Sequence, residues 1–154
     1  MIREDKMDYT VLHMELTTDP KAVGYAPYLT ATNDLMVANL MNSPTGSGAA
    51  LMQMDYLSHD AFASMLAPAV MALGSATTAL QTKWSPMLTL VSGISTVYLS
   101  TTTMWMLSQL QADGLITATQ LTSGTTRVFS RAEVLFGMNT AIQWQDVAKA
   151  MGRG

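Results

Sequence analysis

The side chains in this sequence that are best suited to chemistry are its two histidines and a few scattered carboxylates. His59 follows Asp55 by four residues, so the two would share a face if this segment were helical. His13 has a similar neighbour in Glu15. Two such groups can contact one metal ion, but a metal site normally needs three or four ligands. No cysteine and no HExxH or DxDxDG spacing supplies them, so we expect surface or boundary histidines, no metal and no cofactor.

A catalytic nucleophile or a phosphate-binding loop would also leave a recognisable pattern, and the sequence contains neither. Serines are abundant, but none stands in a GxSxG turn. Gly46-Ser47-Gly48 lacks the lysine and the helix that follow a phosphate-binding loop. Asp19 is explained better as the cap of a turn than as a catalytic carboxylate. We therefore predict a protein that is not an enzyme, with no catalytic residue and no small-molecule substrate.

Charged side chains are scarce, and their distribution is uneven. They make up 12% of the chain, about half the usual share. Between Asp60 and Asp113, Lys83 is the only charged residue. Such a segment is a buried core, a membrane segment, or a surface covered by other subunits. The net charge of −3 and the absence of a basic run argue against binding to nucleic acid.

The membrane alternative follows from two uncharged runs, 61–82 and 84–112. Both are longer than the ~20 residues that a membrane-spanning helix needs. Four residues interrupt them: Pro68, Gly74, Pro86 and Gly93. The second run is also rich in serine and threonine, and no cluster of lysine or arginine anchors either side. We therefore expect no membrane insertion.

Residues that begin and end helices divide the chain into short segments. Asn33, Ser58 and Ser130 are predicted helix caps, the last in a capping box with Glu133. The predicted helices are 8–17, 34–41, 59–73, 86–92, 101–113, 131–136 and 144–151, with shorter helical stretches at 76–83 and 118–122. Residues 97–99 and 141–143 are expected to be extended. We predict an all-α fold, a compact single domain over residues 1–154 with about six or seven short helices and long connecting loops.

Large apolar residues at helical spacing predict the core. In helix 59–73 the candidate core residues are Phe62, Met65, Val70 and Met71. The three tryptophans, Trp84, Trp105 and Trp144, are expected to anchor the core. Tryptophan is also enriched at the energetic centres of interfaces, and Trp105 is the one to which we assign a contact role.

Two loops are the other candidates for contact with a partner. The aromatic loop Gly24–Tyr28 should pack on the body of the protein, and Tyr25 and Tyr28 are its predicted contact residues. The loop 43–48, which contains Pro44, is rich in glycine and serine, and is expected to be flexible or to contact a partner.

Several short motifs are distributed over about half of the chain. Near the N-terminus stand Glu15-Leu16-Thr17-Thr18-Asp19-Pro20 and then Gly24-Tyr25-Ala26. Nearer the C-terminus stand Leu107-Ser108-Gln109-Leu110, Asp113-Gly114-Leu115-Ile116-Thr117, Ser130-Arg131-Ala132-Glu133 and Asp146-Val147. Together they resemble a group of small virion-associated structural proteins of tailed bacteriophages. The middle of the chain, 45–96, departs from that pattern because it is richer in methionine and threonine.

The resemblance implies a non-enzymatic structural component of a virion, assembled in the host cytoplasm and present in many copies in a symmetric assembly. Its position would be the tail, neck or fibre-attachment region, and its partners would be other virion structural proteins and copies of itself. It carries over no catalytic residue. Three alternatives stay open: a holin-type membrane lysis protein, a capsid-decoration or head-completion protein, and a small hydrolase that uses His13 and His59.

Overall fold

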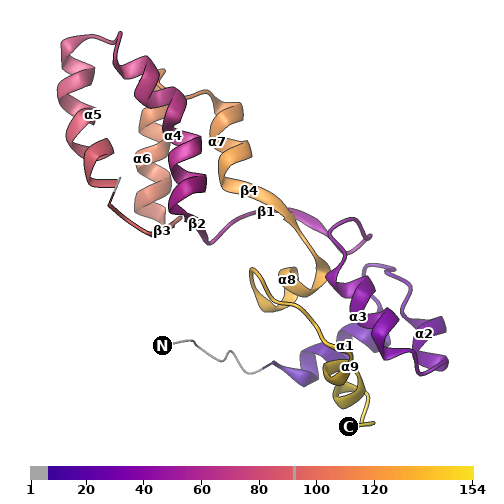
Figure 1. The fold of residues 1–154 in the computed structure, drawn as a ribbon. Coiled ribbons are helices and arrows are strands. Elements are labelled where there is room, and N and C mark those ends of the chain that lie inside the picture. The colour runs from indigo at the N-terminus through magenta and orange to yellow at the C-terminus, as the bar shows by residue number, and fades with distance from the viewer. Residues whose placement is uncertain (1–6, 92) are drawn as a thin grey trace. The chain divides into compact units, whose positions relative to one another are not determined.

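The computed structural model describes residues 7–91 and 93–154, which form short helices and a few short strands (Figure 1). The helices are α1 (Tyr9–Thr18), α2 (Ala26–Thr30), α3 (Asp34–Asn42), α4 (His59–Leu73), α5 (Thr78–Val91), α6 (Thr101–Ala112), α7 (Ala118–Thr125), α8 (Arg131–Phe136) and α9 (Trp144–Ala150). The strands are β1 (Ala50–Gln53), β2 (Tyr56–Ser58), β3 (Thr96–Tyr98) and β4 (Thr126–Phe129).

The prediction of an all-α fold with six or seven helices was wrong. The described residues contain nine helices and four strands, so the protein is mostly helical but mixed. The strands pair β1 with β4 and β2 with β3, in two separate two-stranded sheets. Each strand is only three or four residues long, and its partner lies far away in the sequence. Local periodicity reveals neither such short strands nor their pairing; only the extended segment at 97–99 was anticipated.

The chain divides into two compact units. Among the described residues, unit 1 contains 7–52 and 128–154, and unit 2 contains 53–127. The chain enters unit 2 through β1 and leaves it through β4. We predicted that residues 1–154 form a single domain. That would require the two units to pack together as one body, and it stays a prediction.

Unit 1 is built from α1, α2, α3, α8 and α9, and α9 packs against both α1 and α3. Its core residues are Leu12, Leu16, Tyr25, Val37, Ala38, Met41, Ala132, Ile142 and Val147. Asn33 caps α3 and Ser130 forms a capping box with Glu133 at α8, as predicted. The cap role of Asp19 is also confirmed, because its carboxylate accepts hydrogen bonds from the amides of Val23 and Gly24 at 2.7 and 2.8 Å.

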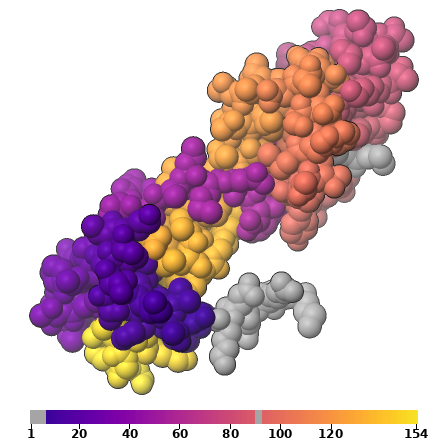
Figure 2. Space-filling view, turned by 180° about the vertical axis from the view of Figure 1, so that it is seen from behind, coloured from indigo at the N-terminus to yellow at the C-terminus, as the bar shows by residue number. Residues whose placement is uncertain are grey.

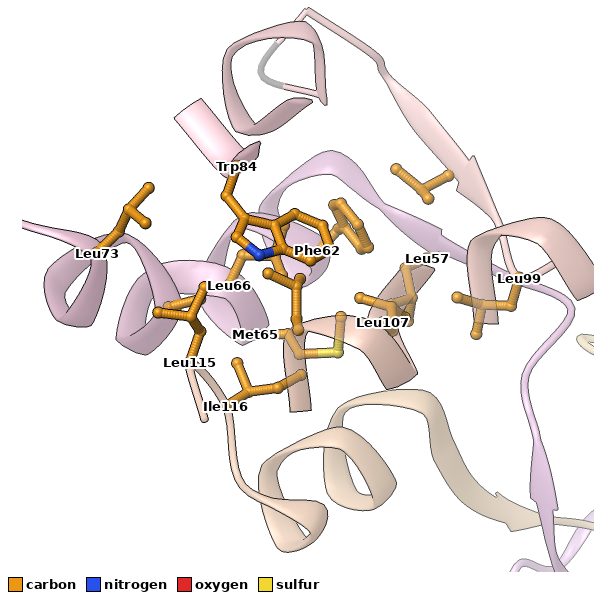
Figure 3. Close-up of a cluster of buried hydrophobic side chains, with 13 residues drawn as sticks. Leu57, Phe62, Met65, Leu66, Leu73, Trp84, Leu99, Leu107, Leu115 and Ile116 are labelled. Atoms are coloured by element: carbon orange, nitrogen blue, oxygen red, sulfur yellow. The ribbon is translucent and has the colours of Figure 1, made fainter. Parts of the chain in front are cut away.

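Unit 2 packs α4 against α5, α7 and the β2–β3 sheet, and α6 against α7. Strands β2 and β3 are antiparallel, with the buried Leu57 opposite Val97 and Tyr56 opposite Tyr98. Figure 3 shows the core side chains from these elements, with Trp84 next to Phe62 and Leu66. Trp84 is 2% exposed, so the prediction that it anchors the core is confirmed.

Helix α5 corrects a predicted boundary. Ser85 and Pro86 were expected to begin a new helix, but α5 runs through both without a break. Proline removes one helical hydrogen bond and does not always end a helix. The large buried ring of Trp84, the residue directly before Ser85, holds the segment against the core and offsets that loss. Pro68 likewise lies inside the continuous helix α4.

Candidate functional site

The two histidines lie in different units, His13 in unit 1 and His59 in unit 2. The Nδ1 atom of His13 lies 2.9 Å from the carbonyl oxygen of Ala150, and Nδ1 of His59 lies 3.3 Å from the carboxylate of Asp60. Asp55 lies in a bend before β2 and His59 begins α4, so the segment between them is not helical and the two do not share a helical face. Over residues 7–91 and 93–154, no three histidine or acidic side chains are grouped to hold a metal ion.

The strongest polar cluster lies inside unit 1 and was not predicted. The guanidinium group of Arg131 donates two hydrogen bonds to the carboxylate of Glu15, at 2.8 and 2.7 Å, and the hydroxyl of Tyr25 donates a third at 3.3 Å. All three residues are buried. The hydrogen bond to Glu15 raises the pKa of Arg131. Burial, followed by the charge of Glu15, raises the pKa of Tyr25 far above its ordinary value.

This cluster is structural in character. The carboxylate of Glu15 already accepts three hydrogen bonds and has almost no exposed surface, so it is not placed to react with a substrate. It joins α1 to α8, two elements far apart in the sequence. Breaking such a buried pair by removing one partner leaves an uncompensated charge and costs about 3–5 kcal/mol.

Gly48 completes this arrangement from the loop 43–48. A Cβ atom at Gly48 would lie 2.9 Å from the Cβ, Cγ and Cδ atoms of Arg131. Real Cβ contacts are not this close, so only glycine lets the loop backbone rest on the arginine stem. The loop that was expected to be flexible or to contact a partner therefore packs, at Gly48, on the interior of its own unit.

The structure places the predicted contact residues very differently from one another. Tyr25 is 0% exposed and forms part of the unit 1 core, so it offers no surface to a partner. Tyr28 is half-buried and Pro44 is exposed. Trp105 and Trp144 were expected in the core, but their exposed fractions are 62% and 51%.

The charge-poor segment 61–112 forms much of the surface of unit 2 as well as its core. Val70 and Met71 were expected in the core, but both are exposed, Met71 by 80%. Trp105 and Tyr98 are also exposed, beside many serine and threonine hydroxyls. Sequence reasoning missed Tyr98; its alternation with the buried Val97 in a short strand was the available signal. The scarcity of charge in this segment is therefore a property of its exposed surface as well as of its buried core.

The one charge of this segment is locally neutralised. The Nζ atom of Lys83 lies 2.6 Å from Oδ2 of Asp113, and the same oxygen accepts a hydrogen bond from Nε1 of Trp84 at 2.7 Å. Hydrogen bonds from Lys83 and then Trp84 lower the pKa of Asp113. The negative charge of Asp113 thus neutralises the positive charge of Lys83, and the same carboxylate satisfies the indole N–H of the buried Trp84.

Two open grooves lie on unit 2. The α6 groove, with a volume of about 470 Å³, is lined by Gln53, Leu99, Thr101, Met104, Trp105 and Ser108. The α4–α7 groove, with a volume of about 580 Å³, is lined by apolar residues such as Leu57, Met65 and Pro68, by four uncharged polar residues, and by Arg127. The α6 groove contains no charged residue. Figure 2 shows one face of unit 2, where α6 and α7 (orange) reach the surface.

In the part of the chain that the structure describes, none of the helices combines the length and hydropathy needed to cross a bilayer. Comparisons with protein-family models, curated proteins and solved structures find no match to this chain. The candidate functional site is therefore the exposed, charge-poor surface that residues 61–112 contribute to unit 2.

Proposed function

We propose that this protein is a non-enzymatic structural component of a tailed-bacteriophage virion, acting through protein–protein interfaces in a symmetric assembly. Its place would be the tail, neck or fibre-attachment region. The observation that carries the proposal is the surface of unit 2, on which residues 61–112 contribute exposed tryptophan, tyrosine, methionine and valine side chains but only one charged residue, Lys83.

The physical argument concerns the cost of covering a surface. Burying a charged side chain in an interface requires removal of its water, and that cost is recovered only with a well-placed partner. The centres of interfaces are accordingly depleted in charge and enriched in aromatic residues and methionine. A surface made of hydroxyls, thioethers and aromatic rings loses little hydration free energy when a partner buries it. The same surface offers little of the charge that keeps freely dissolved proteins apart.

The assignment to a virion rests on the resemblance of the short motifs to bacteriophage structural proteins. Assembly would take place in the host cytoplasm, and the partners would be other virion proteins and further copies of this chain. A capsid-decoration or head-completion role uses the same surface and differs only in its position in the particle.

Mass spectrometry of purified particles tests this proposal. The chain should be present at a fixed copy number relative to the capsid protein, and the copy number should match the symmetry of one part of the particle. Sub-particles stripped of their tails would distinguish a tail or neck position from the capsid. A chain that is consistently absent from intact infectious particles would contradict the proposed function.

A further inference from the structure

Helix α5 is attached to unit 2 by few buried side chains. Of its residues 78–89, whose side chains the structure describes, only Trp84 is fully buried. Leu80, Met87 and Leu88 pack against the core but remain partly exposed. The docking of α5 therefore depends mainly on one tryptophan ring. By comparison, α4 is of similar length and buries Phe62, Met65, Leu66, Ala69 and Leu73.

The residues of α5 do not favour a helix by themselves. Pro86 lies inside the helix and has no N–H to donate to the preceding turn. Thr78, Thr82 and Thr89 are β-branched, which lowers the stability of a helix further. An isolated helix of this length, 14 residues, is only marginally stable in water even when its residues favour helix. We therefore expect α5 to lose its helical structure once Trp84 leaves the core.

One carboxylate strengthens this attachment. Oδ2 of Asp113 accepts hydrogen bonds from Nζ of Lys83 at 2.6 Å and from Nε1 of Trp84 at 2.7 Å. Asp113 follows the last residue of α6, and its backbone N–H donates to the carbonyl of Gln109 at 2.9 Å. The helix dipole disfavours a negative charge at this end, so the two donors on α5 offset an unfavourable position. Asp113 thus joins the middle of α5 to the end of α6.

The chain is anchored on both sides of α5. Before it, α4 ends at the buried Leu73. After it, β3 pairs with β2, and Val97 lies opposite Leu57 with both side chains buried. The other fully buried residues of this core come from α4, α6, the two strands, Leu99 and the segment 115–116. Separation of α5 would therefore leave the elements on both sides of it packed.

We propose that α5 is a movable strap on unit 2, which Asp113 holds closed by binding Lys83 and Trp84. Proteins open locally in contiguous units, and the units that open first are those with few buried contacts. In the open state α5 leaves the core as one unit, and the faces of Phe62 and Leu66 next to Trp84 become accessible (Figure 3). Unit 2 then has a closed and an open state that differ in exposed apolar surface. This inference does not depend on the proposed function.

Hydrogen exchange of the full-length chain, followed by mass spectrometry of its peptides at neutral pH, tests the strap. In the wild type the amides of α5 should exchange at least about tenfold faster than those of α4 and α6. Asp113→Ala should accelerate exchange in α5 by a further factor of at least about 10, because the charged acceptor of two hydrogen bonds is lost. Exchange in α4 and α6 should change by less than about twofold.

Three further variants separate the contributions. Lys83→Met removes only one of the two donors, so it should accelerate exchange in α5 less than Asp113→Ala, and it tests the same contact with a smaller perturbation. Pro86→Ala restores an N–H inside α5 and should slow exchange in α5 by at least about threefold. Asp60→Ala is the control, because it removes another carboxylate of unit 2 that is fully exposed, and it should leave exchange in α5 unchanged.

Three results would overturn the inference. In the first, α5 of the wild type exchanges no faster than α4 and α6, so it does not open separately. In the second, Asp113→Ala accelerates exchange equally throughout unit 2, so the carboxylate supports the whole unit. In the third, exchange in α5 is unchanged in Asp113→Ala, so Asp113 does not hold α5 closed. None of these results concerns the presence of the chain in particles, so the proposed function is tested separately.

Discussion

A single methyl group at Gly48 should destabilise unit 1 by acting on its buried ion pair. The Cβ atom of alanine at this position would stand 2.9 Å from three carbons of the Arg131 side chain. The arginine stem cannot easily move aside, because two hydrogen bonds at 2.8 and 2.7 Å hold its guanidinium group to Glu15. Gly48→Ala must therefore either displace the loop backbone or pull Arg131 away from its partner.

The loss of unfolding free energy that we expect for Gly48→Ala depends on which of these two responses occurs. Insertion of a methyl group into a packed site typically costs about 1–3 kcal/mol of unfolding free energy. If Arg131 separates from Glu15, two buried charges lose their partners and the cost rises to about 3–5 kcal/mol. We expect a loss of at least about 1 kcal/mol for Gly48→Ala, measured by urea unfolding at neutral pH followed by circular dichroism.

The same loop provides the control. At Gly46 the nearest atoms to an added Cβ lie 3.8 Å away, which is ordinary van der Waals contact. Gly46→Ala should therefore change the unfolding free energy by no more than about 0.5 kcal/mol. In an Arg131→Ala background, where two of the three close carbons are gone, the penalty for Gly48→Ala should shrink by about 1 kcal/mol.

Equal unfolding free energies for Gly48→Ala and Gly46→Ala would refute this reasoning. So would a Gly48→Ala penalty that is the same with and without the arginine stem, because the methyl group would then act on the loop alone.

Three further predictions concern pH and packing. Because the pKa of Asp113 is lowered in the folded state, its contribution is present above the ordinary carboxyl pKa of 3.8 and is lost as the pH falls through the folded value. The stability difference between wild type and Asp113→Asn, from urea unfolding, should therefore shrink as the pH is lowered below the ordinary carboxyl pKa of 3.8. Because the pKa of Tyr25 is raised, unit 1 should lose stability above about pH 10, and Tyr25→Phe should reduce this loss in alkaline unfolding curves. Gly124→Ala would place a Cβ atom 2.5 Å from Met65 in unit 2, and should lower the unfolding free energy by about 1–3 kcal/mol in urea; an unchanged midpoint would show that Met65 moves freely.

The start of several helices could be predicted from the sequence alone. A cap such as Asn33, Ser58 or Ser130 bonds to the amide three residues ahead, so all the atoms involved belong to one short segment. For the same reason the predicted limits of α4 and α8 agree with the structure. The scarcity of charge between Asp60 and Asp113 is likewise a property of composition, visible before any folding is known.

Other features depend on residues that are distant in the sequence. The pairing of β2 with β3, and of Glu15 with Arg131, joins segments whose proximity no local pattern records. The three tryptophans have the same intrinsic tendency to be buried, yet only Trp84 is in a core. Their exposed fractions differ because only one face of each helix packs against a neighbouring element. In α6, Leu107 lies on the buried face and Trp105 on the exposed face.

The sequence by itself therefore determined the helix caps, the low charge and the absence of a recognisable catalytic motif. Tertiary structure alone decided that this low charge belongs to an exposed surface, and that Trp105 stands beside an uncharged groove on it. The physical reason is range: caps and composition act within a few residues, whereas burial is decided by packing between elements that the chain brings together only on folding.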